Sequence, residues 1–336
     1  MSHRDENGFY NPLWMTGENQ PGGQMRPLRL LRWRLGGTRV RWPERIIDPA
    51  PPGDPWTEPP AGTISVTFIG HSCFLIRLPG LVVITDPQFS ERASPVGWAG
   101  PKRARPPGRP LAALPPIDLV LLSHNHYDHL DLPSLRALHR HSAPKVITPL
   151  GNTVYVRRAA PLAVHELDWW DTAPIARPAG ARVTALPARH FSARSLRDNG
   201  RALWAGFMLE SQGIKVLFAG DSGDGAHWQA IRECMGAPDL ALLPIGAYAP
   251  RDLMQRVHMD PEEAVRAHCT LQATRSIGMH FGTFQLTDEA IDEPERRLAQ
   301  ACRNQGVPAT EFVTLGFGAC CSIIAAPQET VRHAEG

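Results

Sequence analysis

The sequence predicts an α+β fold in which two β-sheets pack back to back and helices cover their outer faces. A series of short strands followed by helices begins near residue 64, and a second such series begins near residue 182. When strands followed by helices occur twice in a chain, the two sets of strands can form two sheets that pack together, with the helices on the outer faces. Several predicted strands also end in loops that carry His or Asp, and such loops converge on one edge of a layered fold. The fold class therefore predicts a shared site at that edge.

The first series is predicted from the spacing of apolar residues. Alternation over residues 64–69 predicts a half-buried strand, and Pro79-Gly80 marks a turn between the two strands that follow. The consecutive apolar residues of 117–122 predict a short buried strand. Asp131 precedes an apolar repeat with Pro in its first turn, which predicts a helix start. In order, this series has strands at 64–69, 73–78, 81–84, 117–122 and 145–148, and helices that begin at Asp131 and near Asn152.

The second series repeats strands before helices. Its clearest helix start is Asp260, because Pro261 and Glu263 complete the pattern of an N-cap with a capping box. The predicted strands are at 183–186, 205–210, 214–218, 240–243, 274–278, 311–315 and 320–324, and the predicted helices at 260–271 and 288–303.

Three regions are predicted along the chain. Residues 1–60 are rich in Pro, Gly, Arg and Trp, which predicts an extended N-terminal arm. Residues 61–326 form the folded domain, and residues 327–336 are a C-terminal tail. Within the arm, residues 26–45 carry seven arginines against the single acid Glu44. Such a segment could touch an anionic membrane surface peripherally, or it could pack on its own domain.

Composition narrows the functional classes. The chain has 336 residues, 43% of them hydrophobic, and a net charge of +2, which argues against a nucleic-acid partner. Its six cysteines form no C-x-x-C pair, as expected in a reducing compartment. The N-terminus lacks the pattern of a signal peptide, and no apolar run reaches the length of a membrane span. We therefore expect a cytoplasmic protein, or one held peripherally on the inner membrane surface. The composition is also compatible with a homo-oligomer.

One loop concentrates metal-binding side chains directly after the strand at 117–122. Residues 124–129 read His-Asn-His-Tyr-Asp-His, and imidazole nitrogen and carboxylate oxygen are ligands of zinc and similar ions. Because one loop can serve two metal positions about 3.5 to 4 Å apart, the spacing predicts His124 and His126 on one metal, with Asp128 and His129 on the other. A polar surface loop is the alternative interpretation.

Further ligands are required to complete two sites, and the sequence offers them at other strand ends. His190 follows the strand at 183–186, Asp221 follows 214–218, and His280 follows 274–278. Asp221 is the expected bridge, since one carboxylate can turn an oxygen toward each metal.

With these residues the sequence resembles the metallo-β-lactamase fold superfamily and, within it, the N-acylphosphatidylethanolamine-hydrolysing phospholipase D (NAPE-PLD) family. The resemblance implies a four-layer αββα sandwich with two Zn²⁺ ions, or Mn²⁺ or Fe²⁺, on the seven ligands named above. One departure is that a polar residue lining the phosphate pocket of the mammalian relative aligns with Gly97. The motifs cover about residues 60 to 320 and are FIGHS (68–72), TDPQFS (85–90), GPKR (100–103), SHNHYDHLD (123–131), LWAGF (203–207), HMDPEEA (258–264) and HFGTF (280–284).

The resemblance implies a zinc-dependent hydrolase, a phosphodiesterase of phospholipase D type that acts on N-acylphosphatidylethanolamine-like phospholipids. A water between the metals, ionised near neutral pH, would be the nucleophile, with Asp128 and Asp221 as catalytic metal ligands. His258 could orient the substrate or protonate the leaving group, or it could only pack in its loop. Tyr127 could reach the substrate or support the ligand loop. The alternatives are a lactonase or other ester or amide hydrolase acting on a small molecule, and a non-catalytic metal-binding module.

Two further groups have open roles. His71 could hold a metal ligand through its ring or serve the fold alone. The arginines of the loop after His190 could receive a phosphate by bidentate contact or be solvated; they are Arg194, Arg197 and Arg201.

Overall fold

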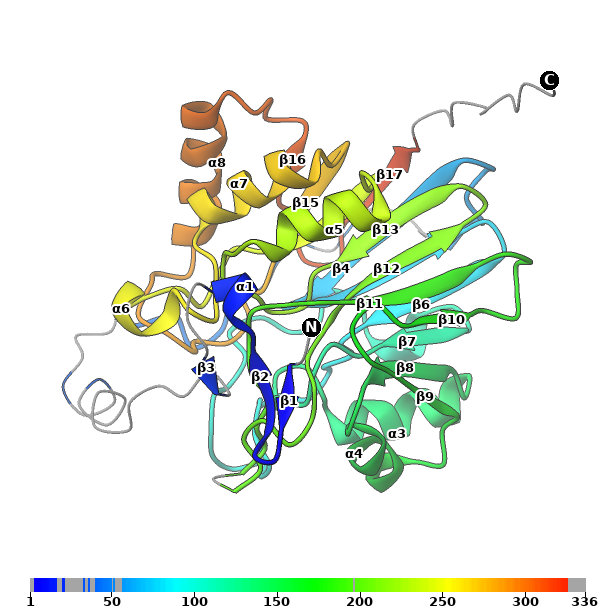
Figure 1. The fold of residues 1–336 in the computed structure, drawn as a ribbon, viewed down its shortest axis with the longest axis horizontal. Helices are drawn as coiled ribbons and strands as arrows, with labels where there is room; N and C mark the ends of the chain where they lie inside the picture. Colours follow the sequence, from blue (N-terminus) through cyan, green and yellow to red (C-terminus); the bar gives the residue numbers. More distant parts are fainter. Residues whose placement is uncertain are drawn as a thin grey trace.

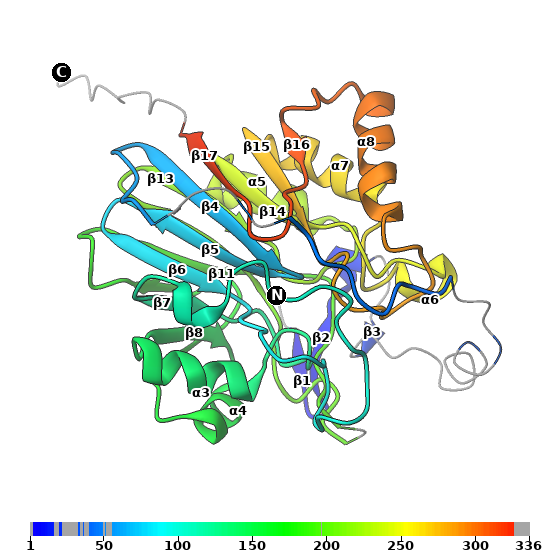
Figure 2. The same cartoon turned by 180° about the vertical axis from the view of Figure 1, so that it is seen from behind.

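Two seven-stranded β-sheets lie at the centre of the molecule, seen here in a computed structural model (Figure 1). The structure describes residues 3–16, 20–21, 33, 36, 40–49, 51, 56–195 and 197–325. Helices α3 (Leu132–His141) and α4 (Thr153–Ala159) lie outside one sheet, and α5 (His227–Met235), α7 (Pro261–Leu271) and α8 (Glu293–Gln305) outside the other, as Figure 2 shows from behind. The predicted αββα sandwich is confirmed.

The first sheet has the strand order β17-β4-β5-β6-β7-β8-β9. Its first four strands pair antiparallel, whereas β6 to β9 pair parallel. Since parallel strands end at the same edge, the loops that follow β6 and β7 emerge side by side. The strands are β4 (Thr63–Gly70), β5 (Cys73–Leu78), β6 (Leu81–Thr85), β7 (Leu119–Leu121), β8 (Lys145–Pro149), β9 (Val164–Leu167) and β17 (Cys320–Ile324).

The second sheet is built on the same plan, in the order β10-β11-β12-β13-β14-β15-β16. Here β10 to β13 pair antiparallel and β13 to β16 parallel. The loops after β13 and β15 therefore also share an edge. The strands are β10 (Thr172–Pro174), β11 (Arg182–Leu186), β12 (Gly206–Ser211), β13 (Ile214–Phe218), β14 (Leu240–Pro244), β15 (Arg275–Met279) and β16 (Phe312–Val313).

Alternating side chains of the first sheet supply two separate cores. In β5, Phe74 and Ile76 belong to the core that includes Phe207 of the second sheet. Their neighbours Cys73 and Leu75 belong to a second core with residues of α3 and α4. This is the alternation expected of a strand buried on both faces, because successive side chains point to opposite sides.

The helix starts follow their capping residues. Asp131 accepts a hydrogen bond from the backbone N–H of Ser134 and begins α3, and Asp260 with Glu263 forms the predicted capping box of α7. The predicted helix at 288–303 begins later, at Glu293, because Glu289 is used in a loop, where its carboxylate accepts the N–H groups of Ala247 and Ala249.

Several elements were not predicted from the sequence, and one is shorter than predicted. Helix α5 has no side-chain cap, so no start signal marks it. The strand predicted at 311–315 is only the two residues of β16. The other elements not predicted are short: β9, β10, the 3-10 turn at Leu111–Ala113 and α6 (Arg251–Met254).

The N-terminal arm is more ordered than predicted. Its first residues form a small three-stranded sheet and a helical turn, in which Phe9 and Met15 are buried against the body. Later in the arm, Trp42 donates a hydrogen bond to Glu289 O, and the N–H of Ile46 to Ala104 O. The elements are β1 (Arg4–Asp5), β2 (Gly8–Asn11), α1 (Leu13–Thr16) and β3 (Gln20–Pro21).

Most of the basic segment at 26–45, and all of the predicted tail at 327–336, lie outside the described residues. The domain boundary near residue 60 stays a prediction. Across the residues that are described, no helix has both the length and the apolar character needed to cross a membrane.

Candidate metal centre

Loops from both sheets bring the seven predicted ligands together. His124, His126, Asp128 and His129 follow β7 in the first sheet, while His190, Asp221 and His280 follow β11, β13 and β15 in the second. The cluster therefore lies where the edges of the two sheets meet. Convergence of this kind was predicted from the fold class, and the structure shows it.

Three histidines form the first half of the cluster. His124 Nε2 lies 2.8 Å and His190 Nε2 lies 3.2 Å from His126 Nδ1. His190 donates its other ring proton, on Nδ1, to Val257 O at 2.9 Å, which leaves Nε2 unprotonated and facing the cluster. Burial lowers the pKa of His126 to about 3 and that of His190 to about 4, so both rings are neutral at pH 7. Neutral ring nitrogens that face one another in this way are suited to share a cation.

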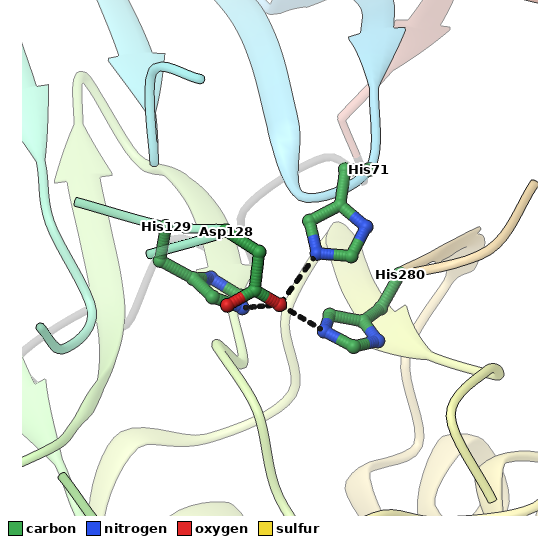
Figure 3. Close-up of side chains that lie close together, drawn as sticks. All are labelled: His71, Asp128, His129 and His280. Atoms are coloured by element: carbon green, nitrogen blue, oxygen red, sulfur yellow. Dashed lines mark hydrogen bonds and ion pairs between the residues drawn. The ribbon is translucent and has the colours of Figure 1, made fainter. Parts of the chain in front are cut away.

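The second half combines three histidines with a carboxylate, as Figure 3 shows. Asp128 Oδ2 lies 3.4 Å from both His129 Nε2 and His280 Nε2, and 3.0 Å from His71 Nε2. The Nε2 atoms of His129 and His280 are buried and, within the described part of the chain, have no hydrogen-bond partner. Burial alone would raise the pKa of Asp128, but the neighbouring histidines hold it well below its usual range. The carboxylate is therefore charged and aimed at the same point as the rings.

Asp221 lies between the two halves. Its Oδ2 is 3.1 Å from both His129 Nε2 and His280 Nε2, and 3.6 Å from His190 Nε2 and 3.9 Å from His124 Nε2. The preceding Gly220 has φ +60°, and a Cβ there would lie 2.8 Å from Ser123 Cβ. A glycine is thus required for Asp221 to reach this position. The structure places the same oxygen, Oδ2, near both halves, whereas the predicted bridge had one oxygen toward each metal.

Asp86 is a buried residue whose role the sequence analysis missed. Its carboxylate accepts a hydrogen bond from His129 Nδ1 at 2.6 Å and two more from the backbone and hydroxyl of Ser123. A carboxylate on the second nitrogen of a metal-binding histidine orients the ring and raises its basicity. The available signal was the position of Asp86 in TDPQFS, directly after β6.

His71 supports the second half through its side chain and its backbone. Its Nε2 donates to Asp128 Oδ2, and its carbonyl oxygen accepts the N–H of His280 at 2.9 Å. His71 and His280 have φ of 59° and 62°, a region that non-glycine residues rarely adopt. Such strain persists where the surroundings hold it, and it is concentrated at functional sites. Of the two roles predicted for His71, the structure supports contact with a ligand.

His258 also faces the cluster. Its Nδ1 lies 4.0 Å from Asp221 Oδ2, and its ring centroid is 5.1 Å from those of His190 and His280. Burial lowers its pKa well below 6.5, so the ring is neutral at pH 7. The structure therefore places this predicted catalytic residue beside the bridge.

Tyr127 and Arg194 hold the ligand loop rather than the cluster. Tyr127 donates its hydroxyl proton to Arg194 O at 3.0 Å, and the Arg194 guanidinium stacks 3.9 Å over the Tyr127 ring. The same guanidinium donates to the carbonyl oxygens of Asn125 and Leu130. The Nη1 group of Arg194, for which a phosphate contact and a solvated position had been predicted as alternatives, thus binds the loop backbone, while the partly exposed side chain also lines the cavity described below. These contacts match the supporting role predicted for Tyr127.

A cavity of about 910 Å³ lies beside the ligand loop. Tyr127 forms part of its wall, and Gly97, the position that departs from the family pattern, forms another part. The lining combines arginines, apolar residues and three acidic residues; it includes Arg136, Arg158, Val96, Leu132, Pro133, Glu91, Asp131 and Asp198. The volume is sufficient for a ligand much larger than water.

The donor set fits two divalent cations. Three neutral imidazoles face one point, and two imidazoles with one carboxylate face another, with the Asp221 carboxylate between them. Nitrogen and oxygen donors of these kinds suit zinc, manganese or iron. Among the residues that the structure describes, Nε2 of His129, Nε2 of His280 and Oδ1 of Asp221 have no hydrogen-bond partner, and burying these atoms without a cation would be costly.

Comparison with known proteins adds an independent finding. Residues 82–281 match the family described as the Beta-lactamase superfamily domain. The N-acyl-phosphatidylethanolamine-hydrolyzing phospholipase D 1 of Caenorhabditis elegans is 36% identical over 263 residues, which cover 75% of this chain and 74% of that protein. The mitochondrial enzyme of that name from Saccharomyces cerevisiae is also 36% identical, over 69% of this chain and 50% of the yeast protein.

Solved structures agree on the fold. A metallo hydrolase from the hyperthermophilic archaeon Ignicoccus hospitalis matches 78% of this chain and 98% of its own chain, with a TM-score of 0.59 and 22% identity. At that identity the likeness concerns the fold alone.

Proposed function

Because the chain belongs to the metallo-β-lactamase superfamily and, within it, to the NAPE-PLD-like family, we propose that it is a dinuclear phosphodiesterase of phospholipase D type. The proposed substrates are N-acylphosphatidylethanolamine-like phospholipids. That the chain is a metal-dependent hydrolase follows from its family; the number of metals, their identity and the substrate are the proposal. The observation that carries it is the position of Asp221 Oδ2 between two converging sets of ligands.

The seven predicted residues would hold the two metals, for which we propose zinc. His124, His126 and His190 would bind the first, Asp128, His129 and His280 the second, and Asp221 both. When bound, such a pair lowers the pKa of a water to about 7 and screens the negative oxygens of a phosphodiester.

The protein's own residues would orient the reaction. Asp86 holds the His129 ring and Val257 O holds the His190 ring, so both present a fixed nitrogen. His258 is neutral and can offer a ring N–H to a phosphoryl oxygen or to the leaving oxygen. Because Gly97 has no side chain, phosphate recognition would depend on the metals and His258 more than in the mammalian relative.

The cavity beside Tyr127 suits a substrate of this class. Its wall combines apolar side chains and arginines with the acids Glu91, Asp131 and Asp198; the apolar side chains would contact an acyl chain and the arginines an anionic headgroup. A lactone or a small ester would need no cavity of this size.

Assays of the purified protein with Zn²⁺ or Mn²⁺ test the proposal. We expect turnover of bis-p-nitrophenyl phosphate and of N-acylphosphatidylethanolamine, and none in His126→Ala. Lactone turnover without phosphodiester turnover would instead support the alternative hydrolase. Metal binding without any turnover would indicate the non-catalytic module.

A further inference from the structure

An uncharged loop forms part of the wall of the large cavity. Residues 93–100, here called the Trp98 loop, read Ala-Ser-Pro-Val-Gly-Trp-Ala-Gly, and they lie between Arg92 and Lys102. Four consecutive residues, 95–98, are exposed, and Trp98 itself is 82% exposed. Single exposed apolar residues are common, but here Val96 and Trp98 are both exposed within three residues, and a contiguous exposed apolar patch marks a binding surface.

The Trp98 loop is held in shape by its own base. Arg92 donates to Gly97 O at 3.1 Å and to Gly100 O at 2.6 Å, and the N–H of Ala93 donates to Pro101 O. Because these bonds fix the backbone, presenting Trp98 to a partner requires little additional ordering.

Basic side chains lie near the Trp98 loop. Arg136 of α3 and Arg158 of α4 are exposed on the cavity that the loop partly lines, and Lys102 is 52% exposed at the base of the loop. Lys102 pairs with Glu91 at 3.1 Å, so these two charges cancel, and Asp131 is buried as the cap of α3. The third acid on the cavity wall, Asp198, accepts hydrogen bonds from Tyr155 and from the backbone of its own loop, which leaves Arg136 and Arg158 as the exposed cations. The exposed charge around Trp98 is therefore predominantly positive.

From this combination we infer that the Trp98 loop is the contact point for an anionic phospholipid bilayer. Tryptophan lies well at the boundary between headgroups and acyl chains, and each flanking cation adds electrostatic attraction to anionic lipids. This contact surface differs from the basic arm at 26–45, which the sequence alone suggested. The cavity and the ligand loop containing Tyr127 would then open toward the lipid; this last consequence rests on the proposed function, whereas the binding does not.

A second copy of the chain is a poorer occupant. A two-fold interface would place the same patch on both sides, so the basic residues around one Trp98 would face those around the other. Four exposed residues also supply far less area than the roughly 1,200 Å² of a stable interface.

Co-sedimentation of the full chain with vesicles tests the inference without any assay of activity. We expect binding to vesicles of phosphatidylcholine with 30% phosphatidylserine, and weaker binding to pure phosphatidylcholine or at high salt. Trp98→Ser should weaken binding about tenfold through the lost apolar burial, and Trp98→Phe should restore most of it. Arg136→Ala and Arg158→Ala should each cost about fivefold.

The chain offers a matched control in Trp170, which is 37% exposed but lies between Asp168 and Asp171. Trp170→Ser should bind like the unchanged protein. Equal binding by Trp98→Ser, or no binding of the unchanged protein to the acidic vesicles, would overturn the inference. A dimer in light scattering that Trp98→Ser dissociates would likewise overturn it and assign the loop to a second copy.

Activity separates this inference from the proposed function. Turnover of water-soluble bis-p-nitrophenyl phosphate should be unchanged in Trp98→Ser, while turnover of vesicle-borne phospholipid should fall with binding. Vesicle binding that depends on Trp98, in a protein that hydrolyses neither substrate, would refute the proposed function and leave the membrane contact standing.

Discussion

The two halves of the centre use similar ligands but rest on different supports. His124, His126 and His190 are held by neutral groups, such as the hydroxyl of Ser123 and the carbonyl oxygen of Val257. His129 and His280 are surrounded by carboxylates: Asp86, Asp128 and Asp221. In the first half, burial lowers the pKa values of the rings, which are therefore neutral. In the second half, the nearby carboxylates outweigh the effect of burial and raise the pKa values of both rings. In the metal-free protein, the neutral rings of the first half can bind a cation directly, whereas the rings of His129 and His280 in the second half carry protons that a metal must displace.

Replacing the bridge should have the largest effect, because Asp221 serves both halves. We expect Asp221→Asn to lower turnover by about a thousandfold or more, since metal ions supply several kcal/mol of transition-state stabilisation. Elemental analysis should show both metals reduced, and His126→Ala should reduce the first alone. Full metal content in Asp221→Asn would show that the carboxylate is not a bridge.

Removing the metals should destabilise the fold. Chelation leaves the buried carboxylates of Asp128 and Asp221 with only the protonated rings of His129 and His280 in place of divalent cations, so the melting temperature should fall. A ligand present at 100 to 1,000 times its dissociation constant contributes about 3 to 4 kcal/mol. Differential scanning calorimetry with and without chelator measures the loss, and added Zn²⁺ should reverse it. An unchanged melting temperature would argue against bound metal.

The pH dependence of metal binding should distinguish the halves directly. The pKa of His280 is about 9 in the metal-free protein, because Asp221 and Asp128 overcome the effect of burial. Below that pH a proton competes with the second metal, so its affinity should fall as the pH drops from 9 to 6. His126 and His190, with pKa values of about 3 and 4, lose their protons far below this range. Calorimetric titration in buffers of different ionisation enthalpy should show proton release for the second metal only.

Replacing Asp86, the carboxylate that holds the His129 ring, should have a smaller effect, and it should weaken mainly the binding of the second metal. Asp86→Asn should weaken the second metal by about 10- to 100-fold, the usual range for such partners of a metal-binding histidine. The first metal should be less affected, since His124 contacts Asp86 only through Ser123. Competition with a chromogenic chelator measures both affinities, and equal weakening of the two would contradict the assignment.

The smallest change is expected at Tyr127. Tyr127→Phe removes one hydrogen bond to Arg194 O and should cost about 1 kcal/mol of unfolding free energy. Turnover should stay within a few-fold, because the hydroxyl serves the loop. Urea unfolding measures the free energy and steady-state kinetics measures the turnover. A hundredfold loss of turnover would instead support the catalytic role predicted for Tyr127.

The sequence alone determined the order of the main elements, and it predicted the seven side chains that the structure brings together. Local signals sufficed, because apolar alternation, caps such as Asp260 and the position of His or Asp after a strand are all readable over a few residues. The spacing within the ligand loop predicted how its four residues divide between two metals, and the family resemblance then supplied the expected ions and activity.

Only the tertiary structure decided how those ligands are supported. Asp86 meets His129, and His71 meets both Asp128 and His280, across separations that no local periodicity encodes. The contacts of Arg194 Nη1 with the carbonyl oxygens of Asn125 and Leu130 were not predicted for the same reason, since they form only when two loops pack. Local pattern can show which side chains are able to bind a metal, but their charge and orientation depend on neighbours that come together only when the two sheets close.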